Sequence, residues 1–263
     1  MTFLQAIFLG VVQGLTEFLP VSSSGHLVFF QSVFGLAEPQ LAFDVMLHLG
    51  TLLAVVVYFR TDISRVLLGT WAWVRGGREG EEEAKLLLWI VVASVPTGLM
   101  GVLLKDWFES LFSRPKTVGL MLLVTGLLLW LTRIVKRNEK TTGQMGVWDA
   151  LVIGIAQGVA IIPGISRSGS TISTGLFCRL DRELAGKFSF LLSIPAILGA
   201  TFLEFREIGA GPGIGVTFIG MAVSFFVGLV ALKLLMNIVK KGKLSYFSYY
   251  CWAVGVLMIL LAK

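Results

Sequence analysis

Charged side chains and cysteines are both scarce in this sequence. Asp, Glu, Lys and Arg make up 14% of the 263 residues, hydrophobic residues make up 56%, and the mean hydropathy is +0.84. Soluble domains carry far more charge than this, so the composition excludes a soluble protein. The two cysteines, Cys178 and Cys251, lie far apart in or beside apolar segments, which argues against a disulfide framework or a cysteine metal site.

Long apolar segments take the place of charged surface. About six of them approach or reach the roughly 20 residues that a helix needs to cross a bilayer. They lie at residues 43–59, 86–104, 115–135, 188–203, 208–232 and 244–262. The sequence therefore predicts an all-α polytopic membrane protein that forms a single integral membrane domain over residues 1–263. The N-terminal segment lacks the basic start and the cleavage site of a signal peptide, so we expect it to belong to the fold.

Lys and Arg residues are distributed unevenly among the predicted loops. They gather in segments 60–85, 133–140, 179–187 and 240–243, and they are fewer in the loops between these segments. The positive-inside rule assigns the basic loops to the cytoplasm, which places both termini on the outer side. The net charge of +6 thus has an explanation in membrane topology, and we expect no nucleic-acid partner.

The sequence contains an internal repeat. Residues 6–25 align without a gap with residues 150–169, and both segments contain G-x-x-Q-G followed by S-x-S-G. The identical pairs are Ala6/Ala150, Gly10/Gly154, Gln13/Gln157, Gly14/Gly158, Ser22/Ser166, Ser24/Ser168 and Gly25/Gly169. Hydrophobic bias does not produce polar identities of this kind. We therefore interpret the chain as two repeats, about 1–140 and 145–263.

The apolar segment that follows each serine cluster is short. Residues 26–36 and 170–177 each provide about half of the roughly 20 residues that a membrane crossing requires. We predict two re-entrant helical hairpins, each followed by three transmembrane helices. An odd number of crossings turns the second copy over, which gives an inverted-topology repeat. The polar turns of the two hairpins are then expected to meet near the middle of the membrane.

The two predicted turns are rich in groups that bind phosphate. Intramembrane ionisable residues are costly and mark functional sites. Each turn begins a new half-helix, whose free N–H groups bind anions, while hydroxyls donate to phosphate oxygens and an arginine clamps them. We assign phosphate binding to Ser22, Ser24, Gly25, Ser166, Ser168, Gly169, Ser170 and Thr171.

The two turns differ in the residues that could perform chemistry. The unequal pairs are Glu17/Ile161, Ser23/Arg167 and His26/Ser170. A proton acceptor, a nucleophile and a cation divided in this way favour a phosphoryl-transfer enzyme, so we predict Glu17, Ser23, His26 and Arg167 as catalytic residues. Ser23 and His26 are close enough in sequence to face one cavity. Attack by Ser23, attack by His26 and attack by water activated at Glu17 all stay open.

The motifs E-F-L-P-V-S-S-S-G-H at 17–26 and P-G-I-S-R-S-G-S-T at 163–171 closely resemble the undecaprenyl-diphosphate phosphatases of the BacA (bacitracin-resistance) family. The likeness extends through H-L-G-T at 48–51, A-S-V-P-T-G at 93–98 and S-I-P-A at 193–196. It implies an enzyme of the bacterial plasma membrane that releases inorganic phosphate from a polyprenyl diphosphate lipid and recycles the lipid carrier for cell-wall synthesis. It also implies a divalent cation, Mg²⁺ or Ca²⁺.

The family's first motif has Glu or Gln, three further residues and then Glu. Gln13 and Glu17 occupy these positions, so they are the candidate metal ligands, with only one carboxylate between them. His48 either supports the site or bonds across to a neighbouring helix. From the charge pattern, we expect the active site to open to the periplasmic or extracellular side, and a homodimer is compatible with the sequence. A lipid-phosphate flippase or secondary transporter is the alternative function, because inverted repeats with broken helices are common among transporters.

Overall fold

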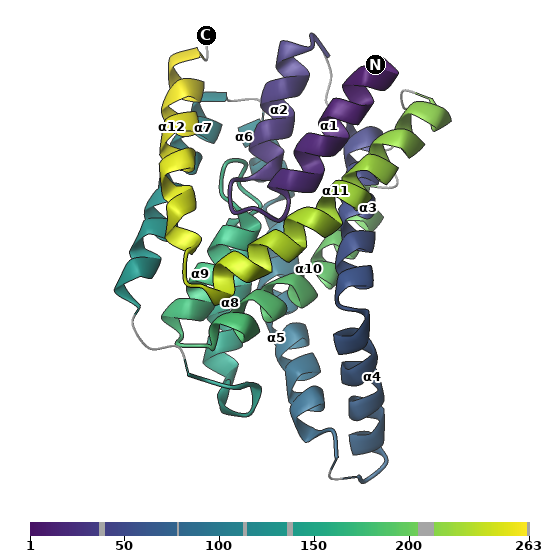
Figure 1. The fold of residues 1–263 in the computed structure, drawn as a ribbon, viewed down its shortest axis with the longest axis vertical. Helices are drawn as coiled ribbons and strands as arrows, with labels where there is room; N and C mark the ends of the chain where they lie inside the picture. The colour runs from purple at the N-terminus through teal and green to yellow at the C-terminus, as the bar shows by residue number, and fades with distance from the viewer. Residues whose placement is uncertain (37–39, 78, 113–114, 136–138, 205–212, 262–263) are drawn as a thin grey trace.

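The computed structural model describes residues 1–36, 40–77, 79–112, 115–135, 139–204 and 213–261, and these ranges are predominantly helical (Figure 1). The helices are α1 (Phe3–Thr16), α2 (Ser23–Val33), α3 (Leu41–Tyr58), α4 (Arg60–Val74), α5 (Glu81–Leu103), α6 (Lys105–Phe112), α7 (Pro115–Leu131), α8 (Val147–Val159), α9 (Arg167–Phe177), α10 (Arg182–Glu204), α11 (Ile214–Lys240) and α12 (Phe247–Leu261). The described ranges contain no β-strand. The predicted all-α class is confirmed.

Within the described ranges, six helices are long and apolar enough to cross a membrane, as the sequence predicts. They are Leu41–Tyr58, Glu81–Leu103, Lys116–Ile134, Arg182–Leu203, Ile214–Lys240 and Leu244–Leu261. The beginning of the predicted segment at 208–232 lies outside the described residues. The chain is therefore a multi-pass membrane protein.

The prediction of a loop over residues 60–85 is wrong for most of that segment. Residues Arg60–Val74 form α4, and α5 begins at Glu81 rather than near residue 86. Three glutamates, Glu81, Glu82 and Glu83, occupy the first turn of α5, where a negative charge is favourable next to the positive end of the helix dipole. Charge therefore extends this helix beyond its apolar segment instead of ending it.

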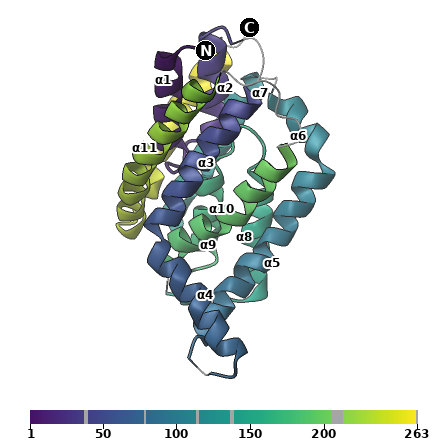
Figure 2. The same cartoon turned by 90° about the vertical axis from the view of Figure 1, so that its right-hand side faces the viewer.

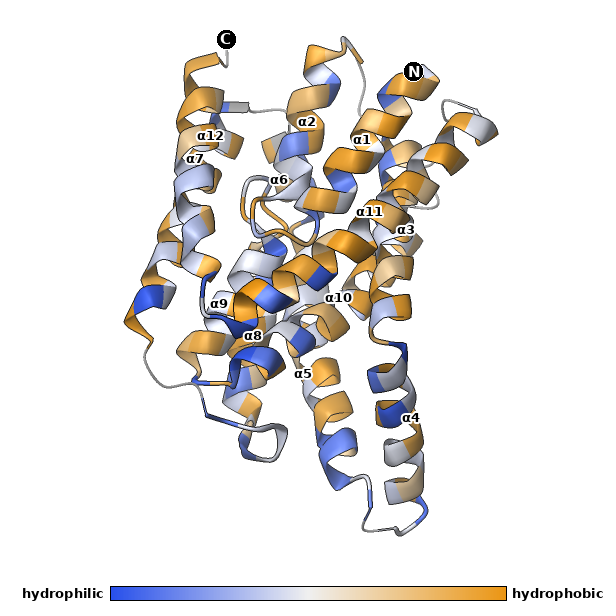
Figure 3. Cartoon of the chain, in the orientation of Figure 1, coloured by the Kyte–Doolittle hydropathy of each residue, from blue (hydrophilic) through white to orange (hydrophobic). Residues whose placement is uncertain are grey.

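The beginning of α1 and the end of α12 lie at one end of the molecule, and the end of α4 and the start of α5 lie at the opposite end (Figures 1 and 2). Hydrophobic residues dominate long helices such as α11, whereas hydrophilic residues are frequent in α4 and at the start of α5 (Figure 3). This arrangement agrees with the predicted placement of both termini on the same side of a membrane.

Two short helical hairpins lie within this bundle. The first consists of α1, with 14 residues, and α2, with 11; the second consists of α8, with 13, and α9, with 11. All four helices are shorter than the roughly 20 residues of a membrane crossing. The helical hairpins are thus present in the structure, while their re-entry into a membrane stays a prediction.

The repeated glycines hold the two hairpins against corresponding long helices. A Cβ atom at Gly10 would lie 2.7 Å from the carbonyl oxygen of Gly220, so α1 packs closely on α11. A Cβ atom at Gly154 would overlap the carbonyl oxygen of Ala93, so α8 packs in the same manner on α5. Three membrane-length helices follow each hairpin, and α5 and α11 are the second of these three in their respective halves. The inverted relation of the halves stays a prediction.

Candidate active site

The turns of the two hairpins contact each other. The backbone N–H of Gly164, in the second turn, donates a hydrogen bond of 3.1 Å to Oγ of Ser22 in the first. A Cβ atom at Gly169 would lie 3.2 Å from Cβ of Pro20. Oγ1 of Thr125 on α7 donates to the carbonyl oxygen of Gly164 at 2.9 Å and accepts the N–H of Ser166 at 3.1 Å. The two polar turns therefore meet, as the sequence predicts.

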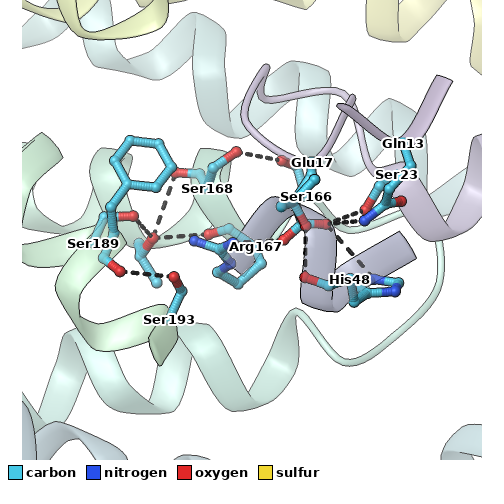
Figure 4. Close-up of polar contacts among 12 residues, drawn as sticks. Gln13, Glu17, Ser23, His48, Ser166, Arg167, Ser168, Ser189 and Ser193 are labelled. Carbon is cyan, nitrogen blue, oxygen red and sulfur yellow. Dashed lines mark hydrogen bonds and ion pairs between the residues drawn. The ribbon is translucent and has the colours of Figure 1, made fainter. Parts of the chain in front are cut away.

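Glu17 lies at the centre of this site (Figure 4). Its Oε1 accepts a hydrogen bond of 2.6 Å from Nη2 of Arg167, so each hairpin provides one member of an ion pair. Its Oε2 accepts hydrogen bonds from Oγ of Ser23 at 2.7 Å and from Nε2 of Gln13 at 3.2 Å. Nε2 of His48, on α3, lies 3.7 Å from the same oxygen. The carboxylate thus brings together four of the predicted site residues.

The charges of this cluster are largely shielded from the surroundings. The side chain of Glu17 is 7% exposed and that of Arg167 is 16% exposed. The guanidinium carbon of Arg167 lies 5.7 Å from the ring centroid of Phe190, which flanks the cation. Within the described residues, Nη1 of Arg167 is buried and has no hydrogen-bond partner. Since unsatisfied buried donors are costly, this N–H group is available for an anionic ligand.

Several hydroxyls predicted to bind phosphate also stabilise the second turn, and their contact with phosphate stays a prediction. Oγ of Ser166 accepts the N–H of Gly169 at 3.1 Å, so Ser166 is the N-cap of α9. Oγ of Ser168 lies 3.3 Å from Oγ of Ser166. Oγ1 of Thr171 donates to the carbonyl oxygen of Arg167 at 2.8 Å and contacts the hydroxyl of Ser189 on α10. These residues shape the second turn around Arg167.

The other predicted phosphate-binding residues lie in the same two turns. Ser24 is partly buried, and its Oγ lies 3.3 Å from Oγ of Ser22. Ser170 is buried, and its N–H donates to the carbonyl oxygen of Ser166 within α9 and its cap. A Cβ atom at Gly25 would lie 2.9 Å from Cγ1 of Val118, so close packing against α7 explains this glycine. Their contact with phosphate stays a prediction.

Both ring nitrogens of His26 contact residues other than Glu17. Its Nδ1 lies 2.8 Å from the carbonyl oxygen of Ser22, and its Nε2 lies 2.8 Å from the hydroxyl oxygen of Tyr250 on α12. Ser23, the first residue of α2, instead donates to Glu17. The two residues that the sequence places next to one cavity therefore have different partners.

His48 lies beside the Glu17 carboxylate, and its supporting role in the site stays a prediction. Its Nδ1 lies 2.8 Å from the carbonyl oxygen of Asp44 in the preceding turn of α3. A carbonyl oxygen only accepts, so Nδ1 carries a proton, and the other ring nitrogen is the one near Glu17. The imidazole is thus fixed beside the carboxylate by its own helix.

The family model for Bacitracin resistance protein BacA matches residues 6–257, which include both turns. The chain belongs to the BacA family. It is 46% identical to the undecaprenyl-diphosphatase of Desulforapulum autotrophicum, over 99% of this chain and 98% of that protein. It is 44% identical to the undecaprenyl-diphosphatase of Halothermothrix orenii, over 100% and 99% of the two chains, and 47% identical to that of Desulfosudis oleivorans, over 96% of each.

The BacA-family resemblance implies a divalent cation. The residues around Glu17 fit a cation that is bound partly by protein side chains and partly by the phosphate oxygens of a substrate. Among the described residues, no group of three or more His, Cys, Asp and Glu side chains could hold a metal ion. However, Oε1 of Gln13 is buried without a hydrogen-bond partner in the described part of the chain, beside the Glu17 carboxylate. Mg²⁺ is commonly held by one or two carboxylates together with phosphate oxygens and water. An amide oxygen and a carboxylate suit that arrangement.

Three residues of this BacA-family site were not predicted from the sequence. Gly164 has φ +96°, and a Cβ atom there would overlap the carbonyl oxygen of Val118, so only glycine fits this position. Thr125 stabilises the second turn, and Tyr250 contacts His26. The only sequence signal for Thr125 and Tyr250 is a polar group within an apolar helix.

Proposed function

We propose that this chain hydrolyses undecaprenyl diphosphate to undecaprenyl phosphate and inorganic phosphate at the turns of its two hairpins. Membership of the BacA family and the names of its relatives support this activity. The site observation that carries the proposal is the contact of 2.7 Å between Oγ of Ser23 and Oε2 of Glu17, with Arg167 on the other carboxylate oxygen. These are the nucleophile, proton acceptor and cation that phosphoryl transfer requires.

In the proposed reaction, Oγ of Ser23 attacks the terminal phosphorus and transfers its proton to Oε2 of Glu17. The bond between that phosphorus and the bridging oxygen breaks, and undecaprenyl phosphate leaves. Water then attacks the phosphorus of the phosphoserine, the bond from phosphorus to Oγ of Ser23 breaks, Oγ takes back the proton from Oε2 of Glu17, and inorganic phosphate is released. The hydrogen bond already joins the two atoms between which the first proton moves.

Arg167 would bind the terminal phosphate while it remains paired with Glu17. Its Nη2 donates to Oε1 of Glu17, whereas its buried Nη1 has no partner within the described residues. A guanidinium presents several N–H groups in one plane, so it can contact the carboxylate and a phosphate oxygen at once. The planar fork thereby places the phosphate next to the carboxylate that takes the proton of Ser23.

The geometry favours Ser23 over the two other candidate nucleophiles. A nucleophilic imidazole needs a free lone pair, but both ring nitrogens of His26 lie within 2.8 Å of other oxygen atoms. Water activated at Glu17 would have to take the place of Ser23 at Oε2. Attack by Ser23 requires no such exchange, because its hydroxyl already donates to Glu17.

We infer that Gln13 and Glu17 hold the divalent cation, Mg²⁺ or Ca²⁺, together with the diphosphate. When bound, the cation would neutralise charge on the phosphate oxygens. The unpartnered Oε1 of Gln13 supports this assignment. By the positive-inside rule, the site opens to the outer side of the plasma membrane.

The proposed activity is tested by measuring phosphate release from undecaprenyl diphosphate in detergent solution. Detergent solution has no separate compartments, so transport cannot account for the signal. We expect stoichiometric release of inorganic phosphate and undecaprenyl phosphate by the purified protein. Ser23→Ala, which removes only the hydroxyl, should lose this activity while it elutes as a folded protein. No release above the rate of Ser23→Ala would overturn the proposal.

A further inference from the structure

The ring of His26 is held on both sides by contacts that the proposed reaction does not use. Its side chain is buried, with 4% of the residue exposed. Nδ1 lies 2.8 Å from the carbonyl oxygen of Ser22, and Nε2 lies 2.8 Å from the hydroxyl oxygen of Tyr250. The His26 and Tyr250 rings are nearly parallel, with an interplanar angle of 12° and centroids 5.8 Å apart. Two residues from opposite ends of the chain thus form a defined pair.

The chemistry of these partners determines where the ring protons lie. A carbonyl oxygen only accepts hydrogen bonds, so Nδ1 of His26 must donate its proton to Ser22. In the neutral ring, Nε2 then has a lone pair, which accepts from the hydroxyl of Tyr250. Tyr250 thereby stabilises the tautomer that can donate to Ser22.

The carbonyl group that His26 holds belongs to a strained residue. Ser22 has φ +68° and ψ +96°, a conformation that residues with a Cβ rarely adopt and that persists only where the surroundings impose it. Its carbonyl oxygen lies 2.8 Å from Nδ1 of His26 and also accepts the backbone N–H of His26 at 3.3 Å, while its Oγ accepts the N–H of Gly164 at 3.1 Å. The shorter of the two contacts to this carbonyl oxygen therefore depends on the orientation of the imidazole.

The strained residue directly precedes the proposed nucleophile. Ser23 begins α2, and its Oγ reaches Oε2 of Glu17 at 2.7 Å. A change of φ and ψ at Ser22 would redirect the following peptide and displace this hydroxyl. Small misplacements of reacting groups cost much of the rate, so such a displacement would lower turnover in the proposed reaction.

We propose that Tyr250 is a positioning residue of the active site, which acts through His26 and the Ser22 carbonyl to hold Ser23 against Glu17. The role in turnover rests on the proposed function, whereas the tautomer of His26 does not. Tyr250 comes from α12, so the last helix of the chain sets the geometry of the first turn. His26 is in this account a structural donor.

Kinetics of four variants test the positioning role. Tyr250→Phe removes only the hydroxyl, and we expect kcat to fall about tenfold with KM unchanged, as for the loss of one buried hydrogen bond. Tyr249→Phe is the matched control, because its hydroxyl lies on the neighbouring residue and contacts Arg133 at 3.2 Å, and it should keep the wild-type kcat. His26→Asn retains a donor near the position of Nδ1, whereas His26→Gln retains one near Nε2.

We expect His26→Asn to retain about ten times the kcat of His26→Gln, because only the former can still donate to Ser22. Equal and complete loss in both variants, or wild-type kcat in Tyr250→Phe, would overturn the positioning role. If the wild-type protein releases no phosphate, the proposed function is wrong. The NMR measurement described below would still show whether Tyr250 donates to His26.

The tautomer is measured by ¹⁵N NMR of the protein labelled at its histidines. The sequence has 2 histidines, so a His48→Asn variant assigns the two sets of ring signals. We expect Nδ1 of His26 to be protonated and Nε2 to be an unprotonated acceptor, whose signal moves toward that of a free nitrogen in Tyr250→Phe. A proton on Nε2 in the wild type, or an unchanged spectrum in Tyr250→Phe, would overturn the proposal.

Discussion

The turns after α1 and α8 share a sequence pattern but use it differently. They are alike where the hairpins pack, since Gly10 and Gly154 both bring a hairpin helix against a long helix. They differ where the ion pair forms, since Glu17 corresponds to Ile161 and its partner Arg167 corresponds to Ser23. The shared glycines pack both hairpins in the same way. The unequal residues place the carboxylate of the ion pair in the first turn and its guanidinium in the second.

The equivalent serines, Ser22 and Ser166, adopt different conformations in the two turns. Ser166 has φ −76° and caps α9 with its own hydroxyl. Ser22 has φ +68°, makes no side-chain cap to α2 and accepts from Gly164 across the site. A non-glycine residue in such a conformation costs on the order of 1–3 kcal/mol. The first turn is thus the strained one, and it carries the proposed nucleophile.

The largest expected effect comes from removing the carboxylate that only the first turn has. Glu17→Gln keeps the size of the side chain but removes the proton acceptor, so phosphate release should fall about 1,000-fold. Ile161→Leu, at the corresponding position of the second turn, conserves volume and should keep most of the rate. The measurement is turnover of undecaprenyl diphosphate in detergent. A fully active Glu17→Gln would remove the carboxylate from the mechanism.

A smaller loss is expected from replacing the guanidinium with a single positive charge. Arg167→Lys keeps the charge but cannot contact Glu17 and phosphate in one plane, so turnover should fall about 100-fold. Arg133→Lys makes the same exchange at a residue that bonds Ser245 and Tyr249, outside the site, and should be near wild type. Near-normal turnover of Arg167→Lys would show that charge alone suffices.

The equivalent glutamines should differ in their response to the cation. Gln13 lies beside Glu17, whereas Nε2 of Gln157 donates to Thr97. We expect Gln13→Ala to raise the Mg²⁺ concentration for half-maximal turnover about tenfold, a change of the size seen when a metal site loses one contact. Gln13→Glu should lower that concentration, and Gln157→Ala should leave it unchanged. An equal rise of the Mg²⁺ concentration in Gln157→Ala would show that the change does not depend on contact with Glu17, and would contradict the assignment of Gln13.

The smallest expected effect concerns the cap of the second turn. Ser166→Ala should lower the free energy of unfolding by about 1 kcal/mol, because the N–H of Gly169 loses its side-chain acceptor. The melting temperature in detergent should fall by about 2–4 °C. Ser110→Ala is the control, since that hydroxyl only bonds a carbonyl oxygen of its own helix. Equal melting temperatures for the two variants would contradict the capping role.

The parts of this comparison that depend on local sequence could be predicted. Apolar length identifies the six long helices, and the polar repeat locates both turns, because each signal lies within one continuous segment. The sequence does not predict helix α4, because its residues are too polar for a membrane span and its charges are typical of a loop. The pairing of His26 with Tyr250 depends on contact between α2 and α12, which no local pattern encodes.

The central claim is that Ser23 attacks while Glu17 accepts its proton. The most direct measurement is to trap the protein after reaction with undecaprenyl diphosphate labelled in the terminal phosphate. We predict a labelled phosphoenzyme that is stable in acid and labile in alkali, and that maps to the peptide containing Ser23. An acid-labile, alkali-stable adduct on His26, or hydrolysis without any adduct under rapid quenching, would contradict the account.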